Sequence, residues 1–161
     1  KLAGTVFAML QLPHNAALNV RMSAVKLTAE QIAEQQLTAS LRLFQEGQYV
    51  AAITLAGAAE EILGKRLRKL GREPSFDNLK DSIVRIAKLN GDNDPKTEKL
   101  VAELLNSTRN ELKHYAGDEA LEFDLREDAI ELLERAISNF MLLTGVILDE
   151  MAQFWSEVDN T

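Results

Sequence analysis

The stretch that decides the fold is residues 48–72, QYVAAITLAGAAEEILGKRLRKLGR. Apolar residues recur in it at three- and four-residue spacing, which is the pattern of one face of an α-helix. The periodicity predicts a helix that ends before Gly71, because glycine is typical of helix C-termini. Ala52, Ala56 and Ala59 lie on the apolar face. Since small side chains let a neighbouring backbone approach closely, this face predicts tight packing against other helices.

One acidic residue interrupts this apolar face. At about 100° per residue, Glu60 falls within the apolar stripe, whereas Glu61 points away from its centre. A carboxylate in a protein interior is costly unless a cation or several donors meet it. Arg109 is the candidate partner, because a planar guanidinium can pair with a carboxylate in two places; a structural ion pair and a functional site both fit this pattern. The stripe consists of Tyr49, Ala52, Ile53, Ala56, Leu63 and Leu67.

Capping residues and helix-ending glycines divide the chain after residue 27 into helices. Thr28 with Gln31 forms a capping-box pattern, and Asp94 with Pro95 is a typical N-cap followed by proline. No alternating apolar pattern occurs in this part of the sequence, which therefore predicts an all-α domain over 28–161, an up-and-down bundle of four to five helices. The expected helices cover about 29–46, about 48–70, a short stretch ending at Asn90-Gly91, about 95–117, and a long final helix that begins after Asp124 and bends near Gly145.

Residues 1–27 have a different pattern and are expected to form a separate N-terminal arm. The stretches TVFAMLQL and NVRMSAVKL, joined by PHNAA, are compatible with a hairpin, an irregular arm or an extra helix. The apolar run from Leu2 to Leu12 is too short to span a bilayer, although a signal-peptide core has a similar length. His14 in the connecting stretch is interpreted as a surface residue. We expect a cytoplasmic protein that does not insert into membranes.

The composition is that of one ordinary globular domain. The chain has 161 residues, no cysteine and a net charge of −7. Without cysteine, disulfides, thiolate zinc sites and a cysteine nucleophile are excluded. The negative charge argues against non-specific coating of nucleic acid, because such surfaces are basic, but it leaves room for a small basic site. We expect no metal and no cofactor, since the sequence has no cluster with metal-ligand spacing and no Gly-rich phosphate loop.

The second informative stretch is 106–117, NSTRNELKHYAG, in the last turns of the fourth predicted helix. One of only two histidines stands here, five residues after Arg109. At the helical repeat Arg109 and His114 are roughly 140° apart on opposite flanks, whereas Asn110 shares the flank of His114. Bringing Arg109 and His114 to one phosphate therefore needs an irregular helix end, a long reach by the arginine or a second subunit, which predicts a homodimer.

A dense basic cluster, KRLRKLGR at 65–72, ends the second predicted helix. Cations at a helix C-terminus offset the macrodipole, and a charge run is usually a solvated face. This is nevertheless the one dense basic patch in an acidic sequence, so RNA phosphates are expected there if RNA binds. Its cations are Lys65, Arg66, Arg68, Lys69 and Arg72.

The sequence Arg-Asn-Glu-Leu-Lys-His at 109–114 resembles the R-x4-6-H motif of HEPN domains, the higher-eukaryote and prokaryote nucleotide-binding helical domains. The run LAGAAEEIL in the second predicted helix resembles the small-residue, glutamate-bearing helix common in that family. The resemblance covers about residues 28–150. It implies metal-independent RNA cleavage at a symmetric dimer interface, with a 2′,3′-cyclic phosphate and a 5′-hydroxyl as products.

The resemblance also implies roles for individual side chains. Cleavage needs a group that moves protons near neutral pH, a role that suits His114, and a fixed positive charge for the developing phosphorane, a role that suits Arg109. Asn110 would orient the phosphate or His114, and Glu60 would hold Arg109 in place. These four residues, with the basic cluster, form the candidate site.

The tyrosine next to this motif departs from the HEPN toxins that are paired with nucleotidyltransferase antitoxins. In those toxins the modified tyrosine lies two places after the histidine, whereas Tyr115 is adjacent to the histidine and Ala116 holds the second place. Tyr115 also falls on the apolar stripe of the fourth predicted helix, so core packing is its expected role.

Three classes of function fit the sequence. The first is an endoribonuclease of a toxin–antitoxin, defence or stress system, with an antitoxin or operon partner. The second is a non-catalytic bundle that binds nucleotides or protein partners and keeps Arg109 and Glu60 as structure. The third is an assembly subunit whose last helix pairs with another chain. Fold alone does not decide among them. The residues that would pair in the third case are Phe140, Leu148, Phe154 and Trp155.

Overall fold

The computed structural model describes residues 24–160, and every regular element in that range is an α-helix. The predicted all-α class is confirmed. The predictions for the N-terminal arm fall mostly on residues 1–23, which lie outside the described residues. The helices are α1 (Ala29–Gln45), α2 (Tyr49–Lys69), α3 (Ser75–Leu89), α4 (Thr97–Leu104), α5 (Ser107–His114), α6 (Leu125–Thr144) and α7 (Asp149–Asp159).

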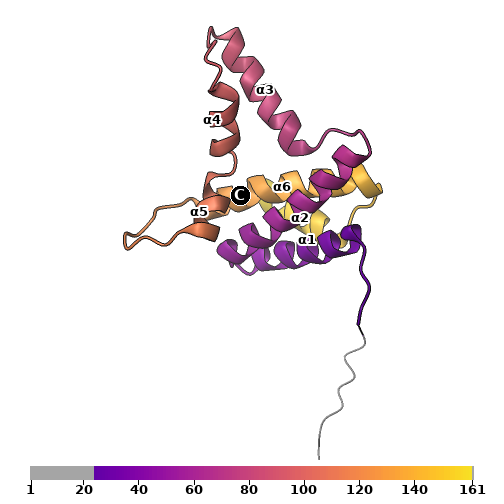
Figure 1. Ribbon diagram of the computed structural model, residues 1–161. Coiled ribbons are helices and arrows are strands. Elements are labelled where there is room, and N and C mark those ends of the chain that lie inside the picture. Colours follow the sequence, from indigo (N-terminus) through magenta and orange to yellow (C-terminus); the bar gives the residue numbers. More distant parts are fainter. Residues whose placement is uncertain (1–23, 161) are drawn as a thin grey trace, which may run out of the picture.

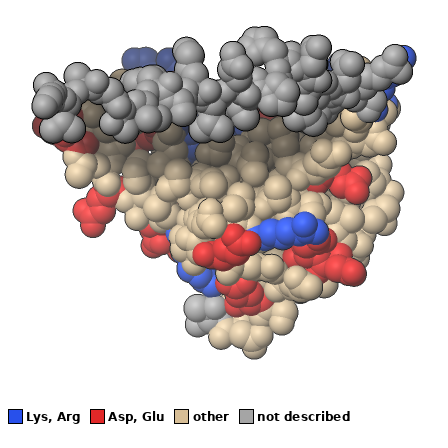
Figure 2. Space-filling model, turned by 90° about the horizontal axis from the view of Figure 1, so that it is seen from below, with Lys and Arg blue, Asp and Glu red and all other residues tan. Residues whose placement is uncertain are grey.

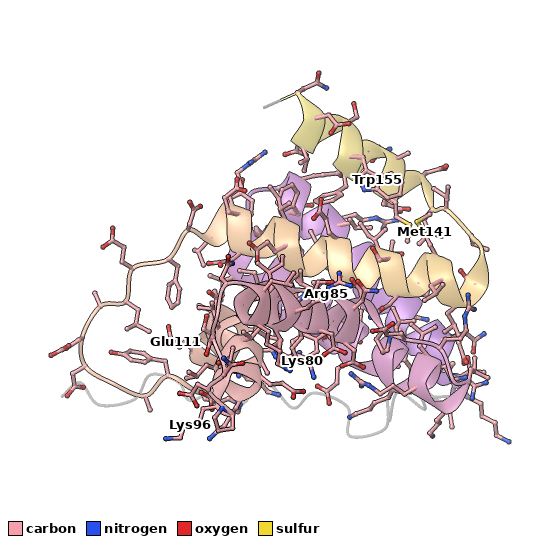
Figure 3. All side chains as sticks on the ribbon, turned by 90° about the horizontal axis from the view of Figure 1, so that it is seen from above. Lys80, Arg85, Lys96, Glu111, Met141 and Trp155 are labelled. Carbon is pink, nitrogen blue, oxygen red and sulfur yellow. The ribbon has the colours of Figure 1, made fainter. Side chains whose placement is uncertain are left out.

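Three long helices form the body of the molecule. α2 packs against both α1 and α6, and α7 covers a further side of α1, while α3 and α4 project from the bundle as a hairpin (Figure 1). Trp155 of α7 and Met141 of α6, both labelled in Figure 3, are partly buried and pack against the core. The core consists mainly of Leu37, Leu41, Phe44, Ala52, Ile53, Ala56, Ala59, Leu63, Leu133, Ala136, Ile137, Phe140, Met151 and Phe154.

The first two helices follow their sequence signals closely. The capping box at the start of α1 is present: Thr28 Oγ1 accepts from Gln31 N at 3.2 Å, and Gln31 Oε1 accepts from Thr28 N at 2.9 Å. Gly47, with φ +72°, turns the chain from α1 into α2. The close approach predicted from the alanines is confirmed, since Ser40 Oγ of α1 donates to Ala52 O of α2 at 2.7 Å.

The helix predicted over 95–117 is instead two helices, which is a correction. α4 ends at Leu104 and α5 begins at Ser107. Asn106 Nδ2 donates to Ala102 O at 3.1 Å, and Arg135 Nη1 of α6 donates to Leu105 O at 3.0 Å. These bonds satisfy carbonyls in the break, so the chain can leave helical geometry there without losing its hydrogen bonds.

The start of α4 also differs from the prediction. Its N-cap is Lys96, and Asp94 belongs to the preceding turn, where its Oδ1 accepts from Lys96 N at 2.9 Å. The last predicted helix is interrupted as well. Asp124 caps α6 as expected, but Gly145, at φ +71°, ends the helix, and α7 then starts separately. A left-handed residue at this place stops the hydrogen-bond ladder instead of bending it.

No helix among residues 24–160 is both long and apolar enough to cross a membrane.

Candidate functional site

The centre of the candidate site is an acid–base pair between α2 and α5. Glu60 is 7% exposed. Its Oε2 lies 3.5 Å from Arg109 Nη1, and the same Nη1 donates to Gly57 O at 3.4 Å. Both the burial of Glu60 and its pairing with Arg109 are therefore confirmed. Glu61, one residue on, is exposed and pairs with Lys65 at 2.6 Å, as its outward position predicted.

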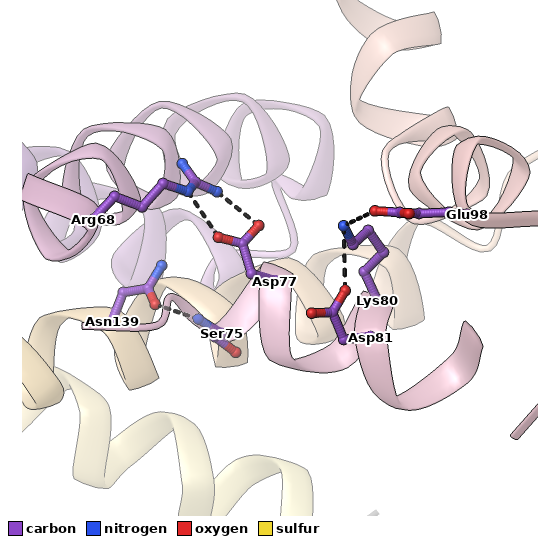
Figure 4. Close-up of polar contacts among 7 residues, drawn as sticks. All are labelled: Arg68, Ser75, Asp77, Lys80, Asp81, Glu98 and Asn139. Atoms are coloured by element: carbon purple, nitrogen blue, oxygen red, sulfur yellow. Dashed lines mark hydrogen bonds and ion pairs between the residues drawn. The ribbon is translucent and has the colours of Figure 1, made fainter. Parts of the chain in front are cut away.

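A second arginine, which sequence reasoning missed, faces the same carboxylate. Arg135 of α6 is 7% exposed. Its guanidinium carbon lies 5.6 Å from the centroid of the Phe76 ring, and its Nη1 is bonded to Leu105 O. The signal for it was an arginine placed four residues before Asn139, beside the apolar stripe of α6. Asn139 is itself fully buried, and its Oδ1 accepts from Ser75 N at 2.7 Å (Figure 4).

The surroundings of Glu60 act on its proton affinity in two directions. Burial raises the pKa of the Glu60 carboxyl above its usual value, because the charged form loses hydration. The positive charges of Arg135, Arg109 and Arg68 oppose this shift. The pKa remains raised on balance, which means that the cations around Glu60 do not fully compensate the cost of burying its charge.

The histidine of the motif stands away from this pair. His114 and Asn110 are exposed and line an open depression together with Glu111 and Tyr115. Arg109 instead lines cavities against α2 and α6, next to residues such as Gly57 and Leu132. This arrangement agrees with the angular separation predicted for the motif. A single copy thus places Arg109 and His114 on different sides of α5.

The expectation that Tyr115 packs in the core is wrong. The side chain is 45% exposed, and its hydroxyl donates to the carbonyl of Glu119 in the following loop. The physical reason is that α5 ends at His114, so that Tyr115 adopts an extended backbone with ψ 128°. A residue outside the helix no longer shares the helix's apolar stripe.

The basic cluster at 65–72 is largely paired with carboxylates of its own chain. Arg68 makes two hydrogen bonds to Asp77, at 2.7 and 2.9 Å (Figure 4). Lys65 pairs with Glu61 and Arg66 with Glu30, each at 2.6 Å. Within residues 24–160, Lys69 and Arg72 have no carboxylate within ion-pair distance, so they are the cations of this cluster whose charge is left for an outside partner.

Charge elsewhere is mixed. The face in Figure 2 shows acidic and basic side chains scattered over a broad uncharged surface, and no continuous basic patch appears on the part left uncovered by the undescribed residues. Among residues 24–160, no group of three or more His, Asp or Glu side chains is arranged to hold a metal ion.

Comparisons of the chain with protein-family models, with curated proteins and with solved structures found no match.

Proposed function

We propose that this chain is a HEPN-type helical domain that cleaves RNA without a metal ion, at a site completed by two copies of the chain. The observation that carries the proposal is the placement of Arg109: its Nη1 is held by a buried carboxylate and a backbone carbonyl, and an exposed histidine follows on the same short helix. An arginine fixed in this way can present charge to a phosphate without further ordering.

The chemistry needs one proton acceptor, one proton donor and one fixed cation. The RNA 2′-hydroxyl attacks the adjacent phosphorus, forming the O2′–P bond while the P–O5′ bond breaks. His114 takes the proton of the 2′-hydroxyl or, from the second copy, gives a proton to the departing 5′-oxygen. Arg109 stabilises the charge that develops on the non-bridging phosphate oxygens, and Asn110 orients the phosphate or the imidazole. The products are a 2′,3′-cyclic phosphate and a 5′-hydroxyl.

The geometry of α5 supports the proposal of two copies. Because Arg109 and His114 lie on different sides of α5, a phosphate that contacts Arg109 of one copy would meet the histidine of a copy related by a two-fold axis. We propose that the protein acts in the cytoplasm within a toxin–antitoxin, defence or stress system, with an antitoxin or operon partner.

Two observations favour the non-catalytic alternative, in which the domain binds a nucleotide or a partner protein. The side chain of Arg109 is only 23% exposed, and its Nη1 is already bonded to α2. In the basic cluster, carboxylates of the same chain already pair with Lys65, Arg66 and Arg68. In that case Arg109 serves mainly to hold α5 against α2.

Cleavage of single-stranded RNA in EDTA separates the two functions. Single strands are the expected substrate because their phosphates and bases can splay into a cleft. His114→Ala and Arg109→Ala should each lower the rate by about 10² to 10⁴, whereas Lys88→Ala, a surface cation on α3, should cleave like the wild type. Far-ultraviolet circular dichroism and oligomer mass should be unchanged in His114→Ala, so that its loss of rate reports the imidazole alone. Wild-type protein that leaves a panel of RNAs intact with and without divalent ions would support the binding function.

A further inference from the structure

The side chain of Arg109 reaches Glu60 by crossing the backbone of α2 at Gly57. A Cβ atom built at position 57 would lie 2.4 Å from Arg109 Cδ and 3.1 Å from Arg109 Cγ. Both atoms belong to the stem of the arginine, near its own helix, and not to its mobile tip. The missing side chain of Gly57 is therefore what lets the arginine stem lie flat on α2.

Only one nitrogen of the Arg109 guanidinium, Nη1, is bonded to α2. Nη1 meets both Gly57 O and Glu60 Oε2. Nε and Nη2 donate to no acceptor among residues 24–160. Since the Arg109 side chain is 23% exposed, these two donors remain accessible to a phosphate oxygen.

α5 has few other attachments to the bundle. It is eight residues long and contains no buried residue. Leu112 is its one partly buried apolar side chain that packs against the core. A helix of this length is not stable in water by itself, so its docking on α2 decides whether it forms at all. Arg109 and Leu112 provide that docking.

We infer that Gly57 and Glu60 are positioning residues that clamp Arg109 on α2, and that this clamp holds α5 in place and so sets where Asn110 and His114 stand. The inference rests on the proposed function only in naming RNA as the substrate that Arg109 and His114 would meet. The clamp explains how a helix with no buried residue keeps a defined position.

The chain offers a matched control for testing the clamp. Gly57 and Gly64 are both buried glycines within α2, and both have helical backbone geometry. A Cβ at Gly64 would meet only ordinary contacts, the nearest being Pro74 Cβ at 3.6 Å. Both substitutions to alanine raise helix propensity equally, so the difference between them reports the collision with Arg109.

Amide hydrogen exchange of residues 106–115, read by mass spectrometry, is the measurement. Gly57→Ala should exchange there about tenfold faster than the wild type, whereas Gly64→Ala should exchange at the wild-type rate. In the Arg109→Ala background the clamp and the collision are both absent, so adding Gly57→Ala should leave the exchange of α5 unchanged and should not lower stability. It should add only the gain in helix propensity that Gly64→Ala also gives. If Gly57→Ala alone fails to fold, the double variant with Arg109→Ala still tests the clamp, because without the arginine stem it should fold.

Two results would overturn the clamp: equal exchange of α5 in Gly57→Ala and Gly64→Ala, or a further loss of stability when Gly57→Ala is added to Arg109→Ala. Neither result depends on cleavage. If the wild type cleaves RNA, Gly57→Ala should lower kcat while Gly64→Ala keeps it. If the wild type cleaves no RNA, the proposed function fails and the exchange data still decide the clamp.

Discussion

The body of the bundle and the α3–α4 hairpin both carry leucine-rich helical faces, yet they differ in what covers those faces. Leu63 and Leu133, in α2 and α6, are completely buried. Leu89 and Leu104, in α3 and α4, are 82% and 71% exposed. The comparison teaches that helical periodicity predicts which residues share a face, whereas burial requires a second element to lie along that face.

The two regions also differ in how they are held. α2 contacts both α1 and α6 extensively, and the core between these helices is apolar. The hairpin is fastened by polar contacts, including Ser75 N to Asn139 Oδ1 at its base and Lys80 to Glu98 between its helices (Figure 4). Apolar burial scales with area, whereas exposed ion pairs contribute little, so we expect the hairpin to be the less stable region.

The largest difference is expected for leucine truncation in the two regions. Leu133→Ala should destabilise the protein by about 3 kcal/mol, because it leaves a cavity in a core that cannot fully collapse, whereas Leu89→Ala should change stability by less than about 0.5 kcal/mol. Urea unfolding followed by circular dichroism measures both. Similar losses for the two variants would mean that the hairpin face is covered in solution.

The next difference is between neighbouring carboxylates on α2. Glu60→Ala should cost roughly 2 to 3 kcal/mol, because it leaves Arg109 and the buried Arg135 facing an empty space, while Glu61→Ala should cost at most about 0.5 kcal/mol. Equal melting temperatures for the two variants would show that the burial of Glu60 contributes nothing to stability.

The pH dependence of Glu60 should be smaller and opposite in sign to that of the surface carboxylates. Its pKa is raised in the folded state, chiefly by burial, so between the ordinary value and the raised one the unfolded chain releases a proton that the folded chain keeps. The favourable contribution is complete below the unfolded pKa and is lost as pH rises through the folded pKa.

Glu60→Gln does not titrate, so the melting temperature of the wild type relative to this variant should fall as pH increases from about 4 toward neutrality. The carboxylates of Glu61 and Glu150, whose pKa values are lowered by Lys65 and Arg42, are present in both proteins and cancel in the difference. A relative melting temperature that rises over this range would contradict the direction of the shift.

The smallest effect is expected at the hairpin. Lys80 Nζ lies 2.5 Å from Glu98 Oε1 and 3.2 Å from Asp81 Oδ1, but the Glu98 side chain is 62% exposed. Glu98→Gln should therefore cost only about 0.5 kcal/mol, and less at high salt. A loss as large as that of Glu60→Ala in matched urea titrations would show that this ion pair is a main contact between α3 and α4.

The candidate site was predictable in part. The burial of Glu60 was predictable because this residue lies on the same helical face as Ala56 and Leu63. A cationic partner was predictable as well, because burying an unpaired carboxylate is costly. The separation of Arg109 and His114 followed from the helical repeat. Arg135 and Gly57 were not predictable as members of the site. Their neighbours in the sequence do not indicate that Arg135 will lie near Glu60 or that Gly57 will contact Arg109.

The sequence by itself determined the helical class, the capping box at Thr28, the turn at Gly47 and the face of α2 that is buried. These features depend on residues within one or two turns of each other, where spacing along the chain equals proximity in space. Only the tertiary structure decided the break at Leu105–Asn106, the passage of Arg109 over Gly57 and the exposure of the hairpin leucines. Each of those features depends on a segment far along the chain. Arg135 of α6 donates to the Leu105 carbonyl, and Gly57 of α2 leaves the space that the Arg109 stem occupies. The hairpin leucines are exposed because no described helix covers them. The periodicity of one helix does not indicate which distant segment will pack against it, because the packing of the whole bundle decides that.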